Sequence, residues 1–145
     1  MAVTVKKISL WRKEVENKPG VLAGTLEPFA GGGADLQVVM GYRYPGNAAI
    51  AAIEVYPVTG KKMVAAAQAA GMSTAAIPAL LVEGDNRAGL AYGIARALGE
   101  AGINMSFLIG QVVGRKFSAV FGFDSEDDAK KASGLIKKAA GGKKK

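Results

Sequence analysis

Hydrophobic and polar positions along the chain repeat one order of elements twice. Each half opens with a β-rich run, at residues 5–15 and 79–83, and continues into a pattern of apolar residues spaced three to four positions apart. Two more β-runs follow in each half, at 36–44 and 48–56 and then at 105–113 and 116–123. A second helical pattern closes each half. The sequence therefore predicts strand, helix, strand, strand, helix in both halves.

The helical patterns predict which residues face the sheets. In the first helix of each half the apolar stripe is Leu22, Leu26 and Phe29, and Leu90, Ile94 and Leu98. The closing helices are expected at about 61–70 and after Ser125, which is a predicted N-cap, with Ala129, Ala132, Leu135 and Ile136 on the inner face. Pro28 lies inside the first predicted helix and is expected to kink or shorten it near Gly24.

A short strand expected at about 72–77 completes a βαββαβ unit, the ferredoxin-like sandwich, in the first half. We predict an α+β protein of two ferredoxin-like βαββαβ units in tandem, the second of which lacks its own final strand. The predicted domains are residues 1–77 and 78–140, followed by a basic disordered tail at 141–145.

The missing strand has a structural consequence. It leaves the run at 79–83 on an open edge of its sheet, and natural proteins usually cover such edges. Our hypothesis is that the long first β-run, at about residues 3–10 of this chain or of a partner, covers this edge.

The repeat also includes the turn before each first helix. An offset of 69 positions superposes Asn17 on Asn86, Lys18 on Arg87, Gly20 on Gly89, Gly33 on Gly102 and Asp35 on Asn104. A Gly that leads into a helix exposes backbone N–H groups at the positive end of the helix dipole, which suits a carboxylate. Asn17, Asp85 and Asn86 supply acceptor oxygens that suit an ammonium group. Together these groups fit a free amino acid.

The same residues have structural interpretations. Asn17 and Asp85 or Asn86 can be helix N-caps, with Pro19 near the first helical position. Asp35 and Asn104, each at the start of a second strand, can be Asx-turn residues. The spacing alone leaves both interpretations open.

Composition narrows the function. The 145 residues include no Cys and no His, so thiolate metal sites and the commonest general base are absent, and no spacing of nucleophile and base is visible. We expect a protein that is not an enzyme and needs no cofactor and no metal. Five lysines within the last nine residues leave only +2 of the formal charge of +7 for the rest of the chain. We interpret them as a solubilising end, the alternative being an arm for nucleic acid or a membrane surface.

The N-terminal residues lack the apolar core of a signal peptide, and no apolar run is long enough for a membrane span. These features predict a soluble cytoplasmic protein without membrane contact.

Residues 17–22 followed by 33–36, and 85–90 followed by 102–105, resemble two successive ACT domains. The resemblance covers residues 3–140 and implies the βαββαβ fold, binding of a free amino acid, allosteric regulation of a biosynthetic enzyme or regulator, and a homodimer. It places the ligand between units, held by a first loop and by the start of a neighbour's second strand. The implied site residues are Asn17, Gly20, Val21, Leu22, Asp35, Leu36, Asp85, Asn86, Gly89, Leu90, Asn104 and Met105.

Three departures from the family pattern affect this inference. Val15 and Gly84 stand where some serine-binding members carry His, so serine is not favoured. Ala88 replaces the Pro of the first copy, and Asp35 replaces the more usual Asn and would oppose a ligand carboxylate. One or both sites can therefore be degenerate.

Two alternatives use the same fold. RNA-recognition domains share the βαββαβ order, and here Phe117, Phe121 and Phe123 fall on one face of the predicted third strand, where they either stack bases or belong to the core. The spacing matches the RNA-binding pattern only in part, so nucleic acid is disfavoured. A protein-interaction module that binds no small molecule is the second alternative.

Overall fold

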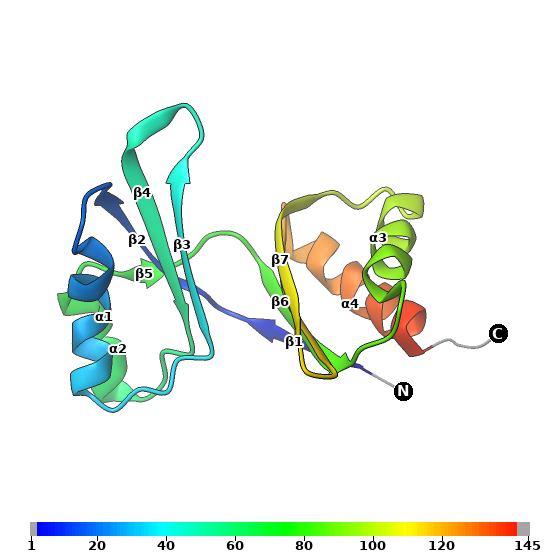
Figure 1. Ribbon diagram of the computed structural model, residues 1–145, viewed down its shortest axis with the longest axis horizontal. Coiled ribbons are helices and arrows are strands. Elements are labelled where there is room, and N and C mark those ends of the chain that lie inside the picture. The colour runs from blue at the N-terminus through cyan, green and yellow to red at the C-terminus, as the bar shows by residue number, and fades with distance from the viewer. Residues whose placement is uncertain (1–2, 142–145) are drawn as a thin grey trace. The chain divides into compact units, whose positions relative to one another are not determined.

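The computed structural model describes residues 3–141, which form two units (Figure 1). Each unit has a four-stranded antiparallel sheet with two helices on one face. The N-terminal unit is Ser9–Ala76, and the C-terminal unit combines the first strand of the chain with the segment from Ile77 onward. The prediction of two α+β, ferredoxin-like units in tandem is confirmed.

The N-terminal unit contains β2 (Trp11–Glu16), α1 (Val21–Gly31), β3 (Val38–Tyr44), β4 (Asn47–Tyr56), α2 (Lys61–Ala69) and β5 (Ser73–Thr74). Its strands lie in the order β3-β4-β2-β5. Alternate residues of β2 and β4 point toward the helices, as the period of two in a strand requires. The core consists of Trp11, Phe29, Ile53, Val55, Val58, Ala67 and Met72.

The C-terminal unit contains β1 (Val3–Ile8), β6 (Ala79–Asp85), α3 (Leu90–Glu100), β7 (Met105–Val113), β8 (Lys116–Phe123) and α4 (Glu126–Gly141). Its strands lie in the order β1-β6-β8-β7. The predicted stripe of α3, Leu90, Ile94 and Leu98, is buried here with Phe117, Phe121, Phe123 and Ile136. This stripe and these aromatic residues fill the space between the helices and the sheet.

The first β-run is split between the two units. β1 pairs antiparallel with β6, from Val3 opposite Gly84 to Ile8 opposite Ala79, and occupies the edge that the missing final strand would have left open. Thus the hypothesis that this segment covers the edge is confirmed, with the strand supplied by the same chain. The predicted boundary differs from the structure in one respect, since residues 3–8 belong to the C-terminal unit and not to a domain 1–77. The unpaired backbone groups of β6 explain this difference.

Helix α1 differs from the sequence expectation in its length and in its buried face. The helix continues through Pro28 to Gly31, because Pro28 lies in the last turn and its missing N–H removes only one bond, to Gly24. Leu22 is not part of the buried stripe, since 44% of its surface is exposed. By contrast, the predicted cap of α4 is present, with the Asp128 N–H donating to Ser125 Oγ at 3.0 Å.

The predicted tail at 141–145 lies outside the described residues except for Gly141, the last residue of α4. Among the helices within residues 3–141, none is both long enough and apolar enough to cross a membrane.

Candidate functional site

The two repeated turns have the same backbone geometry. Gly20 and Gly89 are the N-cap residues of α1 and α3, and both adopt the left-handed conformation with φ of 91° and 80°. In each case a glycine N–H one turn later, in Gly24 or Gly93, donates to the N-cap carbonyl, at 3.0 and 2.9 Å. The chain therefore builds one helix-entry turn twice, as the sequence repeat predicted.

The two asparagines have equivalent backbone partners. The Asn17 N–H donates to the Ala49 carbonyl at 2.9 Å, and the Asn86 N–H donates to the Arg115 carbonyl at 2.8 Å. Neither side chain caps a helix, so the interpretation of these residues as N-caps is wrong. A glycine in the left-handed conformation already sets the chain direction at each helix start.

The Asn17 side chain instead anchors the loop to the sheet. Its Nδ2 donates to the Ala48 carbonyl at 2.7 Å, which leaves Oδ1 as an acceptor. Beside it, the Val21 N–H makes only a long contact of 3.5 Å with the Lys18 carbonyl, and the first-turn N–H groups ahead of Gly24 have no intrahelical acceptor. An acceptor and several donors thus lie at one end of α1.

A pocket of about 510 Å³ lies between this loop and the sheet. Its lining residues are Val15, Asn17, Val21, Leu22, Gly41, Tyr42, Arg43, Ala51, Ala52 and Ile53. The strand register places Val15, Ala51 and Arg43 side by side across β2, β4 and β3, on the helix-facing side of the sheet. The small Ala51 side chain and the absence of one at Gly41 leave room below the first turn of α1. The pocket therefore combines an apolar floor with polar groups at its rim.

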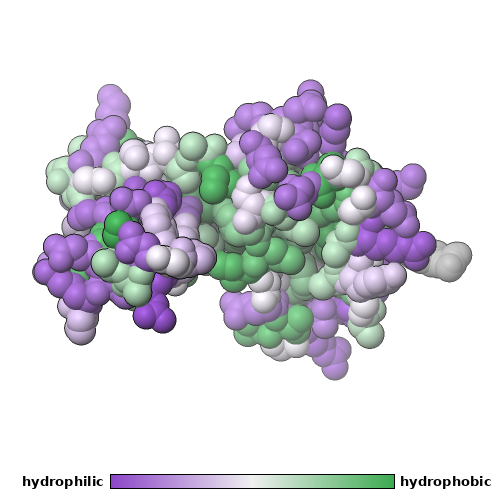
Figure 2. Space-filling view, turned by 90° about the horizontal axis from the view of Figure 1, so that it is seen from above, coloured by the Kyte–Doolittle hydropathy of each residue, from purple (hydrophilic) through white to green (hydrophobic). Residues whose placement is uncertain are grey.

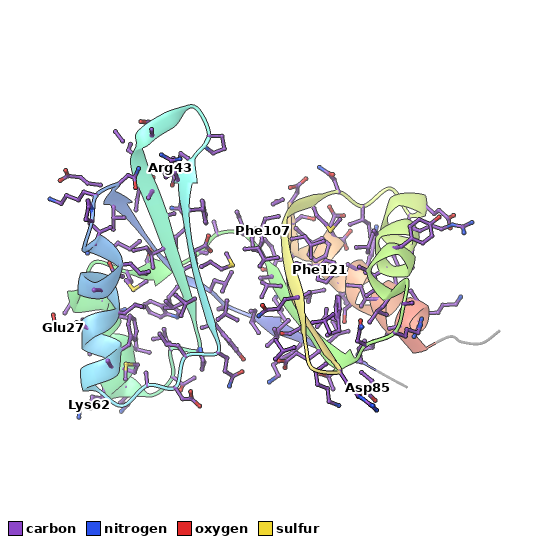
Figure 3. All side chains as sticks on the ribbon, viewed as in Figure 1. Glu27, Arg43, Lys62, Asp85, Phe107 and Phe121 are labelled. Atoms are coloured by element: carbon purple, nitrogen blue, oxygen red, sulfur yellow. The ribbon has the colours of Figure 1, made fainter. Side chains whose placement is uncertain are left out.

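Arg43 is the charged residue of this pocket, and the sequence analysis did not identify it. It lies near the end of β3, toward the turn into β4 (Figure 3), and its side chain is exposed. Its position beside Ala51 depends on the register of the β3–β4 hairpin, which shifts between Arg43 and Tyr44. No local sequence signal reveals such a register, so the pocket floor of Val15, Ala51 and Ile53 was missed as well.

The loop between β6 and α3 is held by ionic and hydrogen-bond contacts of its own side chains. Lys116 Nζ lies 2.5 Å from Asp85 Oδ1, and this hydrogen bond and charge hold the pKa of the Asp85 carboxyl below its usual value. The Arg87 guanidinium donates to the carbonyls of Ala139, at 3.0 Å, and Ala140, at 2.5 Å, near the end of α4. These contacts engage the side chains of the loop within the C-terminal unit itself.

Four predicted site residues lie away from the loops. Asp35 and Leu36 precede β3, whose first residue pairs with Tyr56 at the far end of β4, whereas Gly20 follows the opposite end of β2. Asn104 and Met105 lie in the same way at the end of β7 that pairs with the last residue of β8. Within a unit the structure therefore does not bring these residues to the loop of that unit, and their part in a site shared with a neighbour stays a prediction.

A polar network crosses the other face of the N-terminal sheet. The Tyr42 hydroxyl donates to Glu54 Oε2 at 2.6 Å, and the Arg12 Nε lies 3.9 Å from the same oxygen. Arg12 also donates to the Tyr44 hydroxyl, which donates to Glu14 Oε2 at 2.6 Å. The network therefore joins side chains from all three long strands of this sheet.

This network predicts a pH dependence. Burial, and then the hydrogen bond to Glu54, raises the pKa of the Tyr42 phenol above its ordinary value of 10.0. The folded state therefore holds this proton more tightly than the unfolded state. Its contribution to stability is complete below about pH 10 and is lost as the pH rises through the folded-state pKa. We expect urea denaturation to show a decline in stability above about pH 10 that is shallower in Tyr42→Phe. Equal slopes in the two proteins would contradict this assignment.

The aromatic residues of β8 are not available for base stacking. Phe117, Phe121 and Phe123 are buried in the core of the C-terminal unit. The rings of Phe121 and Phe123 are stacked, with their centroids 6.4 Å apart. RNA-recognition domains bind bases on exposed aromatics of this strand. The RNA-binding alternative therefore loses the surface on which it rested.

Comparisons with known proteins identify the fold. No protein family and no curated protein matches the sequence. Among solved structures, a protein from Bacteroides thetaiotaomicron matches with a TM-score of 0.71 and 16% identity over 92% of this chain and 98% of that chain. The alpha and beta subunits of aspartokinase match with a TM-score of 0.61 and 18% identity, over 96% and 97% of the two chains.

A third similar structure is the regulatory subunit of aspartate kinase from Thermus thermophilus, in a ligand-free form. It matches with a TM-score of 0.61 and 14% identity, over 96% of this chain and 97% of that chain. At such low identity the similarity shows the fold alone. The chain shares with these structures the fold of two ferredoxin-like α+β units in tandem that the sequence predicted.

Proposed function

We propose that this protein is a regulatory protein, not itself an enzyme, that binds a free amino acid at an ACT-type loop site and thereby modulates a partner. The observation that carries this proposal is the pocket below α1. It offers first-turn N–H groups for a carboxylate, Asn17 Oδ1 for an ammonium group and an apolar floor for a side chain.

The regulatory part of the proposal is supported by similarity. The Thermus thermophilus protein is described as a regulatory subunit of aspartate kinase, and this chain covers almost its whole length. By analogy, the partner is a biosynthetic enzyme or another regulator. A bound amino acid acts by stabilising one packing of the units over another. The effect on the partner is limited by the difference between the affinities of the ligand for these two packings.

Strand β7 supports the homodimer that the ACT resemblance implies. It is an edge strand of nine residues without a charged side chain, and Leu108, Ile109, Val112 and Val113 are exposed. The other edge of that sheet, β1, carries two lysines, which are typical protection against strand pairing. Figure 2 shows hydrophobic residues on the surface of this unit, the one that ends at the C-terminus. We propose that β7 pairs with β7 of a second copy.

A single charge tests this dimer. We expect Val113→Lys to convert the dimer to a monomer in sedimentation velocity without lowering the melting temperature of the monomer, because a lysine on an edge strand opposes pairing with a second strand. Lys6→Ala on β1 is the matched control and should leave association unchanged. A wild-type protein that sediments as a monomer at all concentrations would contradict the pairing.

The function itself is tested by a thermal-shift screen of the common amino acids. A ligand at about 100 times its dissociation constant adds roughly 2.7 kcal/mol, which raises the melting temperature by roughly 5 to 10 °C in a protein of this size. A short RNA oligomer at low and high salt is the control for charge-driven binding by the five lysines in the last nine residues of the sequence. A higher melting temperature with one or a few amino acids supports the proposal. An unchanged melting temperature with all of them contradicts it and favours a protein-interaction module.

Gly20 provides the mutational prediction for this site. A Cβ at Gly20 meets no atom within 4 Å, so Gly20→Asp should fold at a cost of about 1 to 2 kcal/mol from the positive φ. We expect its carboxylate to repel the ligand carboxylate and abolish binding in calorimetry. Gly20→Ala carries the same backbone strain without the charge and should retain binding. Equal affinity in all three proteins would remove this loop from the site.

A further inference from the structure

We infer that the two repeated units are not equivalent, that only the N-terminal unit binds ligand, and that Arg43 makes this ligand an amino acid with a second carboxylate. This inference rests on the proposed function and adds to it the location of the site and the class of the ligand. The observation that carries it is a difference between the two sheets at one row of residues, meaning residues that lie side by side on neighbouring strands.

The register identifies the equivalent rows. Val15, Ala51 and Arg43 lie side by side across β2, β4 and β3. In the C-terminal unit, Gly84 pairs with Phe117 and Phe117 pairs with Val112, across β6, β8 and β7. The offset of 69 relates Val15 to Gly84 and Arg43 to Val112. The backbone hydrogen bonds from the N–H groups of Asn17 and Asn86 confirm this correspondence, because each lies two positions beyond its row. Phe117 therefore occupies the position of Ala51.

The difference between Ala51 and Phe117 leaves the space below the start of α1 open and fills the space below the start of α3. Ala51 is small, and the half-buried Val21 above it lines the open pocket. Phe117 is 6% exposed and belongs to the same core as Leu90, the residue equivalent to Val21, which is 2% exposed. A phenylalanine side chain far exceeds an alanine in volume, so the ring and the Leu90 side chain fill the volume that a ligand would need.

The charge of the pocket defines the ligand class. Arg43 is the one cationic side chain among the residues that line it, and none of these residues is acidic. Glu14 and Glu16 of the neighbouring strand alternate with Val15 and so point to the other face of the sheet. A guanidinium binds a carboxylate through two parallel hydrogen bonds, whereas it repels a cationic ligand side chain. The second unit has Val112 in this position, without charge.

The test uses isothermal titration calorimetry of the full chain with L-aspartate and L-glutamate, and with L-lysine as the opposite probe. We expect one equivalent of a dicarboxylic amino acid per chain and no measurable heat with L-lysine. Arg43→Val, which copies the second unit, should weaken binding by roughly 10- to 100-fold, because a hydrogen-bonded charge is lost. Val112→Ala and Gly89→Asp are the matched controls in the second unit and should leave affinity and stoichiometry unchanged.

A second variant, Ala51→Phe, should abolish binding because it introduces the ring of the closed unit. Circular dichroism establishes that it is folded; if it is not, the exposed Arg43→Val still decides the question. Two equivalents per chain would overturn the asymmetry while amino-acid binding stands. Tight binding of a neutral or cationic amino acid that ignores Arg43→Val would overturn the ligand class alone. Absence of binding by every amino acid would overturn this inference together with the proposed function.

Discussion

Removing residues 1–8 is expected to unfold the C-terminal unit while the N-terminal unit keeps its own core. β1 closes the β6 edge through six paired positions, and its Val3 and Ile8 side chains are 8% and 5% exposed. Each buried aliphatic side chain contributes about 1.5 to 3 kcal/mol. Val3 and Val5 pack in the core of this unit, so their loss costs roughly 3 to 6 kcal/mol, which approaches the entire stability of many small domains.

Hydrogen exchange of the truncated protein measures this effect directly. We expect protection to disappear from β6 and β8 and to persist in β2 and β4. Thr4→Ala and Lys6→Ala change exposed side chains of the same strand and are the matched controls, each expected within about 0.5 kcal/mol of the parent protein. Unchanged protection of β6 after truncation would show that the edge does not need this strand.

Replacing Arg12 by Met is expected to lower the free energy of unfolding by about 3 kcal/mol at neutral pH. Glu54 is 1% exposed, and its Oε1 has no hydrogen-bond partner among the described residues. Arg12 is the cation of the network around Glu54, and its Nε lies 3.9 Å from Glu54 Oε2. Without Arg12 the carboxylate keeps only the hydrogen bond from Tyr42. A buried charge that loses its partner carries its full desolvation cost.

A double variant separates this effect from simple loss of packing. Arg12→Met with Glu54→Leu removes the carboxylate as well and should recover most of the stability in urea denaturation. Glu14→Ala removes an exposed acceptor of the same network and should cost less than about 1 kcal/mol. If the double variant were less stable than Arg12→Met alone, burial of Glu54 would not be the reason for the loss.

The candidate site was predictable only in part. The loops followed from the repeat, because a glycine that leads into an apolar helical pattern is a local signal, and the structure shows Gly20 and Gly89 in the same conformation. Arg43, Ala51 and Phe117 did not follow. Their relation is set by strand register, which depends on how each hairpin turn closes and which face each strand buries.

The sequence by itself determined the order of elements, the limits of β7 and β8, the buried stripe of α3 and the cap at Ser125, because residues a few positions apart decide each of these. The sequence also indicated that the first β-run covers the open edge of β6, but it left open whether this chain or a partner supplies the strand. Tertiary structure decided that residues 3–8 of the same chain separate from β2 and join β6, because that choice depends on an unpaired edge far away in the chain. It also decided the difference between the two copies. An alanine and a phenylalanine at one position of a sheet leave a pocket in one unit and a filled core in the other, and only the register brings them into correspondence.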